Sequence, residues 1–480
     1  MKEFKTESEL FEFYKKLSGQ NLSQLFNFLE DKYPNVSTKI KDQKGVVGHL
    51  LEGITGRPPN SDSKADISNL GIELKVLPLT NTTKKIQPKE RCKLKSISYR
   101  DIVNENWETS NLKKKISKIL FLTYIQPKGK TFKDWKEFEF TGPISYELRE
   151  NSPEIVELDW LHIKSKVQKK LADELSESDG NILGACTSGN GKIVKYCEKG
   201  EAKQRSYSLK HSYMKHFFEQ KKHPHQFESI HNKLSSEKPI DESLKDLLNE
   251  KINNKTLKQL SEEYKVKFSS SSKSGFRLLI NKILNIDSKK TPKEINELGI
   301  QIKTIPVNSE YNPWESMSFP KISLVDILNE KWEFPDDNDI EEFESTFKNQ
   351  IDLPFIFIPI IKNKINNKFE PWTSWKVGEI TNWRPDKTEI NGIKREWKEA
   401  KDIIKKEVAT KTIKWGNGFR QNNNLLKQKD TSYIHMRPHA KNSQDIDVPY
   451  KEFTRNSVSI CWQSFWFNKK FITKLIKKET

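Results

Sequence analysis

Apolar residues follow helical spacing in some parts of this chain and strand-like spacing in others, and the same series of patterns occurs in both halves. Helices mixed with short strands favour α/β layers around a sheet. In the first half we expect helices over 8–16, 46–54 and 155–175, and strands over 70–77 and 119–125. In the second half we expect a strand over 353–361 and a helix over 394–408.

The second occurrence of the pattern is an internal sequence repeat. Residues 66–78 read DISNLGIELKVLP, and residues 294–306 read EINELGIQIKTIP. A second pair follows in the same order, ISYRDIVNENWE at 97–108 and ISLVDILNEKWE at 322–333. Matched blocks in one order indicate two homologous domains.

The repeat sets the expected domain organisation. We predict a first domain over 1–222, a second over 240–480, and a polar linker rich in His, Pro and Ser over 223–239. Each domain is expected to be of the α/β class, with a mixed central sheet flanked by helices.

Charge points to a polyanionic partner. The 480 residues contain 84 Lys and Arg against 66 Asp and Glu, which gives a formal net charge of +18. Such a surplus creates a field that attracts nucleic acid. A proteome that is generally rich in lysine would produce the same surplus, so charge alone leaves both interpretations open.

Other compositional features bound the class of protein. The four cysteines form no CxxC pair and no zinc-finger spacing, which favours a reduced compartment. The N-terminal residues lack the basic-then-apolar order of a secretory signal, and no run approaches the roughly 20 apolar residues of a membrane span. We therefore expect a cytoplasmic protein.

Candidate chemistry lies in the first half, where Asp66, Glu73 and Lys75 form D-x6-E-x-K. On a strand, Glu73 and Lys75 point to one face while their apolar neighbours point to the other. Two carboxylates and a backbone carbonyl suit Mg²⁺, and a lysine beside them can activate water for phosphodiester hydrolysis. The spacing alone is weak, because a solvated charged edge strand has the same pattern.

Comparison of the repeats strengthens the catalytic interpretation. Glu52 ends an otherwise apolar helical pattern, where a charge needs a partner or a function. By the repeat alignment, Glu52, Asp66 and Glu73 correspond to an isoleucine, a glutamate and a glutamine in the second half, and only Lys75 keeps its identity, as Lys303. An amide and an isoleucine cannot supply negative charge to a metal. We therefore predict that the first domain cuts and the second binds.

The blocks KGVVGHLLE from residue 44, DISNLGIELKVLP and WETSNLKKKISKILFL from residue 107 resemble the MutH family of the PD-(D/E)xK nuclease superfamily. MRPHAKN at 436–442 and SFWFNKKF at 464–471 are similar to the DNA-contacting blocks of that family. Two MutH-like domains in one chain look like the type II restriction enzymes of the Sau type, which cut at GATC.

The resemblance implies roles for five residues of the first domain. Asp66 and Glu73 would ligate Mg²⁺, and Lys75 would be the catalytic lysine. Glu52 would be an additional carboxylate of the site, and Lys115 would lie near the active site or the scissile phosphate.

Candidate DNA contacts follow from the same resemblance. Arg437 stands where the family places a base-reading arginine, and a guanidinium can bond a guanine edge bidentately. Lys441, Lys469 and Lys470 would contact phosphates, although a solvated basic surface explains them as well. Lys210 belongs to the matching final block of the first domain, whose base-reading residues are not identified.

The expected function is cleavage of double-stranded DNA at a short specific site. One active domain cuts one strand per binding event, so two chains are expected to meet on DNA. The resemblance also implies a DNA methyltransferase in the same restriction system. A nicking enzyme of the mismatch-repair type and a non-catalytic DNA-binding protein are the alternatives.

Overall fold

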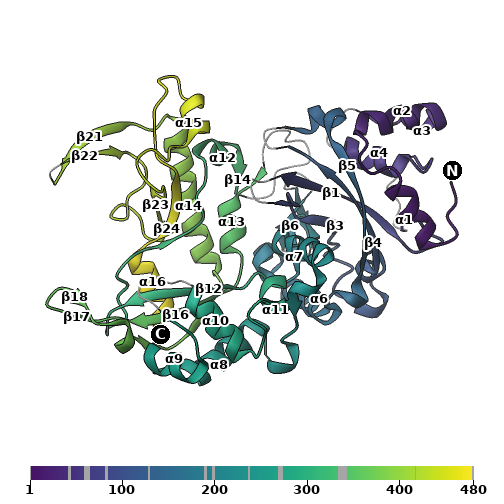
Figure 1. The fold of residues 1–480 in the computed structure, drawn as a ribbon. Helices are drawn as coiled ribbons and strands as arrows, with labels where there is room; N and C mark the ends of the chain where they lie inside the picture. The colour runs from purple at the N-terminus through teal and green to yellow at the C-terminus, as the bar shows by residue number, and fades with distance from the viewer. Residues whose placement is uncertain are drawn as a thin grey trace. The chain divides into compact units, whose positions relative to one another are not determined.

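The structure is a computed structural model (Figure 1) and divides into two compact units, residues 1–224 and residues 225–480 without 333–342. It describes residues 2–41, 45–58, 65–81, 85–127, 130–188, 192–196, 200–235, 238–268, 274–332, 343–416 and 418–477. Two ends of the blocks quoted above, Lys44 and Glu333, lie outside the described residues.

The first unit has mixed α/β architecture. Its helices are α1 Glu7–Lys15, α2 Leu22–Lys32, α3 Pro34–Ser37, α4 Val46–Gly53, α5 Asn111–Ile116, α6 Pro153–Gln168 and α7 His211–Lys222. Its strands are β1 Glu73–Asn81, β2 Ile86–Pro88, β3 Cys92–Ser96, β4 Lys118–Ile125, β5 Glu139–Glu147, β6 Leu183–Thr187, β7 Ile193–Lys195, β8 Glu201–Lys203 and β9 Arg205–Leu209.

Two sheets organise the first unit. The larger has the order β2-β1-β4-β5, in which β1 and β4 are parallel and β4 and β5 antiparallel. The smaller has the order β3-β9-β6 and is antiparallel. Helices α1, α2 and α4 contribute a buried apolar stripe to a core that also contains Leu74, Leu120 and Leu122. This core fixes the start of β1, where the candidate chemistry lies.

The second unit has the same kind of architecture. Its helices are α8 Ile240–Ile252, α9 Leu257–Tyr264, α10 Ser274–Ile283, α11 Lys293–Glu297, α12 Leu324–Asn329, α13 Thr346–Ile351, α14 Lys387–Lys405, α15 Val448–Phe453 and α16 Lys469–Lys477. Its strands are β10 Phe227–Glu228, β11 Thr291–Pro292, β12 Gln301–Val307, β13 Met317–Ser318, β14 Glu330–Lys331, β15 Phe343–Glu344, β16 Phe355–Ile361, β17 Lys364–Ile365, β18 Lys368–Phe369, β19 Lys376–Val377, β20 Thr381–Trp383, β21 Thr410–Trp415, β22 Gly418–Asn423, β23 Ile434–Pro438 and β24 Gln463–Phe467.

The sheets of the second unit repeat those of the first. Strand β12 pairs in parallel with β16, and β16 pairs antiparallel with β19 and β20. The small sheet has the order β13-β24-β23, the counterpart of β3-β9-β6. The strand registers also agree, because Glu73 pairs with Ile119 and Gln301 pairs with Phe355. The predicted mixed α/β class is therefore confirmed.

One buried carboxylate per unit joins the long helix to the small sheet. Asp159 in α6 accepts hydrogen bonds from the backbone N–H groups of residues 181–183. Glu396 in α14 does the same for residues 432–434. Each carboxylate satisfies the N–H groups of the two residues before β6 or β23 and of the first residue of that strand. These contacts match β6 with β23 residue by residue.

Element boundaries differ from the sequence expectation by several residues at β1, α6 and α14. The helix expected over 394–408 is α14, which begins at Lys387 and ends at Lys405. The strand expected over 70–77 is β1, which begins at Glu73 and continues to Asn81. The helix expected over 155–175 ends at Gln168, and Lys170 has a positive φ of 63° that breaks the helical path.

The expected polar linker also differs from the structure. Strand β10 pairs with β11, Ile230 is fully buried, and its N–H donates to the Glu294 carboxylate at 2.8 Å. Residues 227–230 are therefore packed as part of the second unit rather than forming a solvated connection. Residues 236 and 237 of that segment lie outside the described residues.

Among the residues that the structure describes, no helix combines the length and apolar character needed to cross a membrane.

Candidate active site

Glu73 and Lys75 lie at the start of β1, where the strand runs beside β4. Leu74 is buried in the apolar core, as the alternation of the strand predicts. Glu73 is only 2% exposed, so it does not belong to a solvated charged face. A carboxylate that is removed from water requires charged partners or a ligand.

The two oxygens of Glu73 differ in their surroundings. Oε1 lies 2.9 Å from Lys75 Nζ and 3.1 Å from Lys115 Nζ. Oε2 is buried and has no hydrogen-bond partner among the described residues. The structure thus brings Lys115, at the end of α5, to the predicted pair. It leaves one carboxylate oxygen available to a ligand.

Asp66 lies beside the same strand start. Its Oδ2 accepts a hydrogen bond from the Leu74 N–H at 2.9 Å, which holds the carboxylate near the strand. Burial, and next the negative charge of Glu73, raise the pKa of Asp66. A buried carboxylate whose pKa is raised partly by a neighbouring carboxylate is typical of a site that can take up a cation.

Glu52, in the last turn of α4, faces the same charges. Burial and the charge of Asp66 raise its pKa to about 7, while Lys75 acts in the opposite direction. The Tyr14 hydroxyl donates to the Leu51 carbonyl at 2.7 Å and so holds the backbone next to Glu52. Glu52, Asp66, Glu73, Lys75 and Tyr14 therefore belong to one electrostatic neighbourhood.

A divalent metal fits the carboxylates of this neighbourhood. Among the described side chains, no group of three or more His, Cys, Asp and Glu is arranged to hold a metal ion. The predicted ligand set is smaller, because it consists of the Asp66 and Glu73 carboxylates and a backbone carbonyl. The unpartnered Glu73 Oε2 and the raised pKa of Asp66 fit a hard cation there.

Lys75 stays protonated in this environment. Burial pulls its pKa down, but the charge of Glu73 and the contact with its carboxylate raise the pKa overall. Cys92 in β3 lies close enough for Lys75 and Glu73 to act on it, and burial raises the pKa of its thiol to about 12. Cys92 is therefore a neutral, apolar neighbour of the site.

The equivalent place in the second unit has lost these charges. Gln301 starts β12 at the position of Glu73, and its amide donates to the Gly299 carbonyl at 3.1 Å. The position of Glu52 holds Ile280, which is buried. Glu294, in place of Asp66, accepts hydrogen bonds from the Ser229 hydroxyl and the Ile230 N–H. No described contact of these groups requires a metal.

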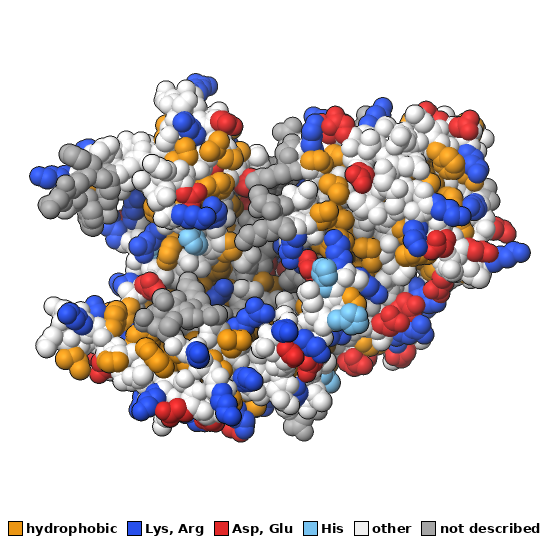
Figure 2. All heavy atoms as spheres, in the orientation of Figure 1, with side chains coloured by type: hydrophobic (Ala, Val, Ile, Leu, Met, Phe, Trp, Pro, Cys, Tyr) orange, Lys and Arg blue, Asp and Glu red, His pale blue; other side chains and the backbone are white. Residues whose placement is uncertain are grey.

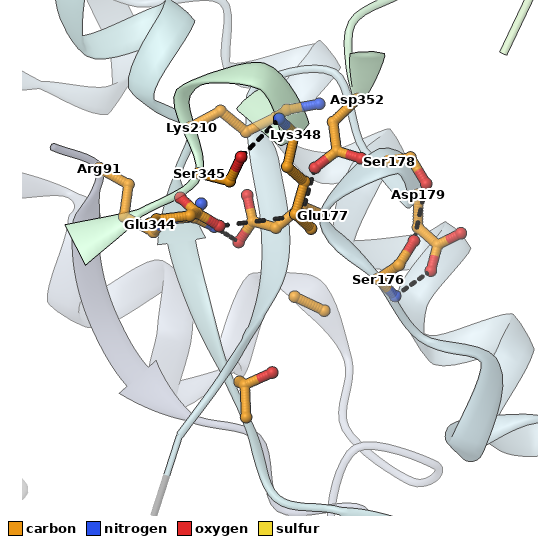
Figure 3. Close-up of polar contacts among 12 residues, drawn as sticks. Arg91, Ser176, Glu177, Ser178, Asp179, Lys210, Glu344, Ser345, Lys348 and Asp352 are labelled. Carbon is orange, nitrogen blue, oxygen red and sulfur yellow. Dashed lines mark hydrogen bonds and ion pairs between the residues drawn. The ribbon is translucent and has the colours of Figure 1, made fainter. Parts of the chain in front are cut away.

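The position of Lys115 has changed as well. Ser110 caps α5 and Ser345 caps α13, in each case by accepting from the N–H three residues later. Lys115 stands five residues after Ser110, and the residue at the same spacing after Ser345 is Gln350. The start of α13 is drawn in Figure 3. Of the charged set, the second unit thus keeps one lysine and one carboxylate.

The candidate DNA contacts of the second unit lie on or beside β23 and β24. Arg437 in β23 is exposed, and its guanidinium stacks over the Trp466 ring at 4.9 Å from the centroid. Such stacking limits the freedom of the side chain without hiding its donors. Lys441 and Lys470 are exposed, and Lys469 is half-buried.

Lys210 differs from its predicted role. Its side chain is buried, and its Nζ donates to the Gly180 carbonyl at 3.0 Å, before β6. This contact favours a structural role over a contact with phosphate. Beside the small sheet, Arg91, directly before β3, forms a buried ion pair with Glu177 (Figure 3), and Glu177 also accepts from the Ser208 hydroxyl at 2.8 Å.

Two neighbours of the site were not found from the sequence. Tyr14 and Cys92 stand in ordinary amphipathic patterns and give no local signal of their position. In the first unit, a pair of parallel strands thus begins with a buried carboxylate held between two lysines, with two more carboxylates close by. This fold and this set of side chains are similar to those expected of a MutH-like nuclease domain.

Comparison with known proteins agrees with this class. Residues 55–159 match the family described as DNA mismatch repair enzyme MutH, and the matched segment contains Asp66, Glu73, Lys75 and Lys115. The chain is 28% identical to the Type II restriction enzyme Sau3AI of Staphylococcus aureus, over 92% of this chain and 94% of that enzyme.

The mismatch-repair relatives match a shorter part of the chain. The DNA mismatch repair protein MutH of Vibrio campbellii is 27% identical over 41% of this chain and 88% of its own length. That of Vibrio vulnificus is 26% identical over 37% and 74%. The expected resemblance to MutH and to the Sau type of restriction enzyme is therefore confirmed.

Proposed function

We propose that this protein is a type II restriction endonuclease that uses Mg²⁺ to hydrolyse phosphodiester bonds of double-stranded DNA at GATC. The main support is the buried Glu73 carboxylate, which has one oxygen between two lysines and the other unpartnered. The likeness to a restriction enzyme over nearly the whole of both chains supports the same class. The recognition sequence rests on that likeness and on the MutH-like blocks.

The residues of the first unit would have different roles in the reaction. Asp66 and Glu73 would hold the metal, which when bound supplies positive charge to the phosphoryl oxygens. Lys75 would orient the attacking water, and its position is set by the Glu73 carboxylate. Lys115 would neutralise charge on the scissile phosphate. Glu52, with a pKa of about 7, is suited to take up a proton near neutral pH.

The second unit would bind DNA without cutting it. Three charged side chains of the site are replaced in the second unit, by Gln301, Ile280 and Gln350. Arg437, in contrast, is exposed on β23. A chain with one active unit cuts one strand per binding event, so two chains would meet on DNA to break both strands. A methyltransferase that modifies the same site is the expected companion in the cell.

Digestion of a plasmid of known sequence tests the function. With Mg²⁺ we expect discrete fragments that end at GATC, and with EDTA or the Glu73→Ala variant we expect none. Gln301→Ala is the matched control and should cut normally. Nicked circles alone would favour the mismatch-repair type of nicking enzyme. Tight binding without any cleavage would identify a non-catalytic DNA-binding protein.

Plasmids with one and with two GATC sites test the meeting of two chains. We expect the two-site plasmid to be cut faster, and an added oligonucleotide containing GATC to speed cleavage of the one-site plasmid. Equal rates under all these conditions would contradict the proposed meeting.

A further inference from the structure

Strands β21 and β22 form a two-stranded antiparallel ribbon, called the ribbon below. Its ladder extends from the Thr410–Asn423 pair to the Trp415–Gly418 pair. At about 3.4 Å per residue, six residues span roughly 20 Å. Figure 1 shows that the ribbon projects from the second unit.

The first unit has no counterpart of the ribbon in the equivalent connection. In the second unit, residues 406–433 connect α14 to β23, whereas residues 169–182 connect α6 to β6 in the first. The ends of the two connections are equivalent, because Asp159 and Glu396 each accept from the N–H groups that precede the following strand. The ribbon is therefore an addition to the shared scaffold.

The stem of the ribbon is fixed beside the strand that contains Arg437. Val408 and Leu425 flank the ribbon and are buried in the core of the second unit. The N–H of Met436, directly before Arg437, donates to the Leu426 carbonyl at 3.0 Å. The ribbon thus begins and ends next to the candidate base-reading strand.

The composition of the ribbon and its flanks suits a polyanion. Residues 408–429 contain five Lys and Arg residues and no Asp or Glu, namely Lys411, Lys414, Arg420, Lys427 and Lys429. Lys411 and Lys414 are exposed on β21, and Gln421 and Asn422 are exposed on β22. Figure 2 shows Lys and Arg side chains at the ribbon and beside its stem. Lysines suit phosphates, and side-chain amides suit the edges of bases.

We propose that the ribbon lies in the major groove of double-stranded DNA, next to the base pairs contacted by Arg437. The major groove admits a two-stranded ribbon, and roughly 20 Å of ribbon corresponds to about six base pairs. Lys411 and Lys414 bind phosphates at the groove edge, and one of the amides of Gln421 and Asn422, which point to opposite faces of β22, faces the bases. This inference rests on the proposed function, in which the second unit binds DNA.

Binding of duplexes by the full-length Glu73→Ala protein, which leaves DNA intact, tests the ribbon. A variant with both Lys411→Ala and Lys414→Ala is compared with a control that carries Lys258→Ala and Lys289→Ala, two exposed lysines outside the ribbon. On a duplex with long flanks around GATC, the ribbon variant should bind at least about tenfold more weakly near 0.1 M salt. Its salt slope should fall by about two.

Duplex length provides the second measurement. When the flanks are shortened to about three base pairs, the parent protein should lose affinity and the ribbon variant should lose much less. Gln421→Ala with Asn422→Ala should weaken binding to the long duplex without changing the salt slope. If the ribbon variant matches the lysine control on both duplexes, the ribbon proposal is overturned.

Arg437→Ala separates this failure from failure of the proposed function. If the parent protein does not prefer GATC duplexes, or if Arg437→Ala binds as the parent does, then the DNA-binding role of the second unit is wrong. If Arg437→Ala weakens binding and the ribbon variant does not, only the ribbon proposal is wrong.

Discussion

The starts of β1 and β12 occupy the same place in two repeats, yet one collects charges and the other has lost most of them. At β1, burial raises the pKa of both Asp66 and Glu52, and the Glu73 carboxylate keeps an unpartnered oxygen. At β12, Gln301 and Glu294 are satisfied by hydrogen bonds within their own unit. The parallel strand pair forms in both units, so the charged set is not needed for the fold.

The difference separates the requirements of folding from those of chemistry. Buried carboxylates close to one another destabilise a folded protein unless a cation joins them. The first unit tolerates this arrangement, and the second has exchanged it for neutral or satisfied groups. Substitutions at matched positions of the two units can therefore test this difference.

The largest expected effect concerns Lys75, the one member of the charged set that the second unit keeps unchanged, as Lys303. Lys75→Met should lower the rate of DNA cleavage about 10²- to 10⁴-fold, because in the proposed mechanism Lys75 orients the attacking water. Lys303→Met should leave the cleavage rate within about twofold. Rates of plasmid cleavage under saturating enzyme give the comparison. Equal losses in the two variants would show that both units take part in chemistry.

The second largest difference is expected between the effects of substituting Arg437 and its counterpart Cys186 on DNA binding. Arg437→Ala should weaken binding to GATC duplexes by about 1–3 kcal/mol and binding to random duplexes much less. Cys186 is buried at the matched position of β6, so Cys186→Ala should leave DNA affinity unchanged. Fluorescence anisotropy with both duplexes measures the effect. An equal loss on both duplexes would make Arg437 a phosphate contact.

Asp66 and Glu294 should have opposite effects on stability. Glu294→Ala should lower the unfolding free energy by about 1–3 kcal/mol, because it leaves the Ser229 hydroxyl and the buried Ile230 N–H without their acceptor. Asp66→Asn should abolish cleavage, yet keep or raise stability, since it removes a charge that burial and Glu73 disfavour. Thermal unfolding without metal tests this contrast. A large loss of stability in Asp66→Asn would contradict it.

The smallest expected effect is a pH dependence of stability. Glu52 has a folded-state pKa of about 7, above its usual 4.5, so the folded state binds more protons between these values. Stability of the metal-free protein should therefore fall as pH rises from about 4.5 to 7, and Glu52→Gln should remove this fall. A change of 1 kcal/mol corresponds to a Tm shift of about 2–4 °C in a unit of this size.

Glu330 provides the control for the pH effect. It is fully buried in the second unit, and burial raises its pKa to about 7 as well. At pH 7.5, Mg²⁺ should restore the stability that is lost when Glu52 ionises. It should not change the stability that is lost when Glu330 ionises. If Mg²⁺ offsets neither, the carboxylates of the first unit do not bind it.

Much of the fold could be predicted from the sequence because the repeat is strong there. The blocks that begin at Asp66 and Glu294 lead into strands with the same register, and the period of two places Leu74 in the core. The charges lost between the repeats were also visible as substitutions at Glu73 and Glu52. A duplicated chain in effect supplies its own comparison.

The remaining features depend on contacts between distant residues. Tyr14 reaches the Leu51 carbonyl, and Lys210 reaches the Gly180 carbonyl, through packing that no local pattern reveals. Residues 227–230 looked like part of a solvated linker because the segment is polar, and no local pattern shows that Glu294, far along the chain, accepts its hydrogen bonds. No expected element covered the ribbon, and no local pattern indicates that it projects from the unit.

The hydrogen bonds of Glu294 restrict how the second unit can evolve. Restoring a metal site there requires new acidic residues at the positions of Ile280 and Gln301, and a free carboxylate at 294. Freeing that carboxylate would remove the acceptor of Ser229 and Ile230 and loosen the segment that leads into the unit. Each step back toward a metal site would cost stability before the last one completed the site, so the change at this place in the second unit is difficult to reverse.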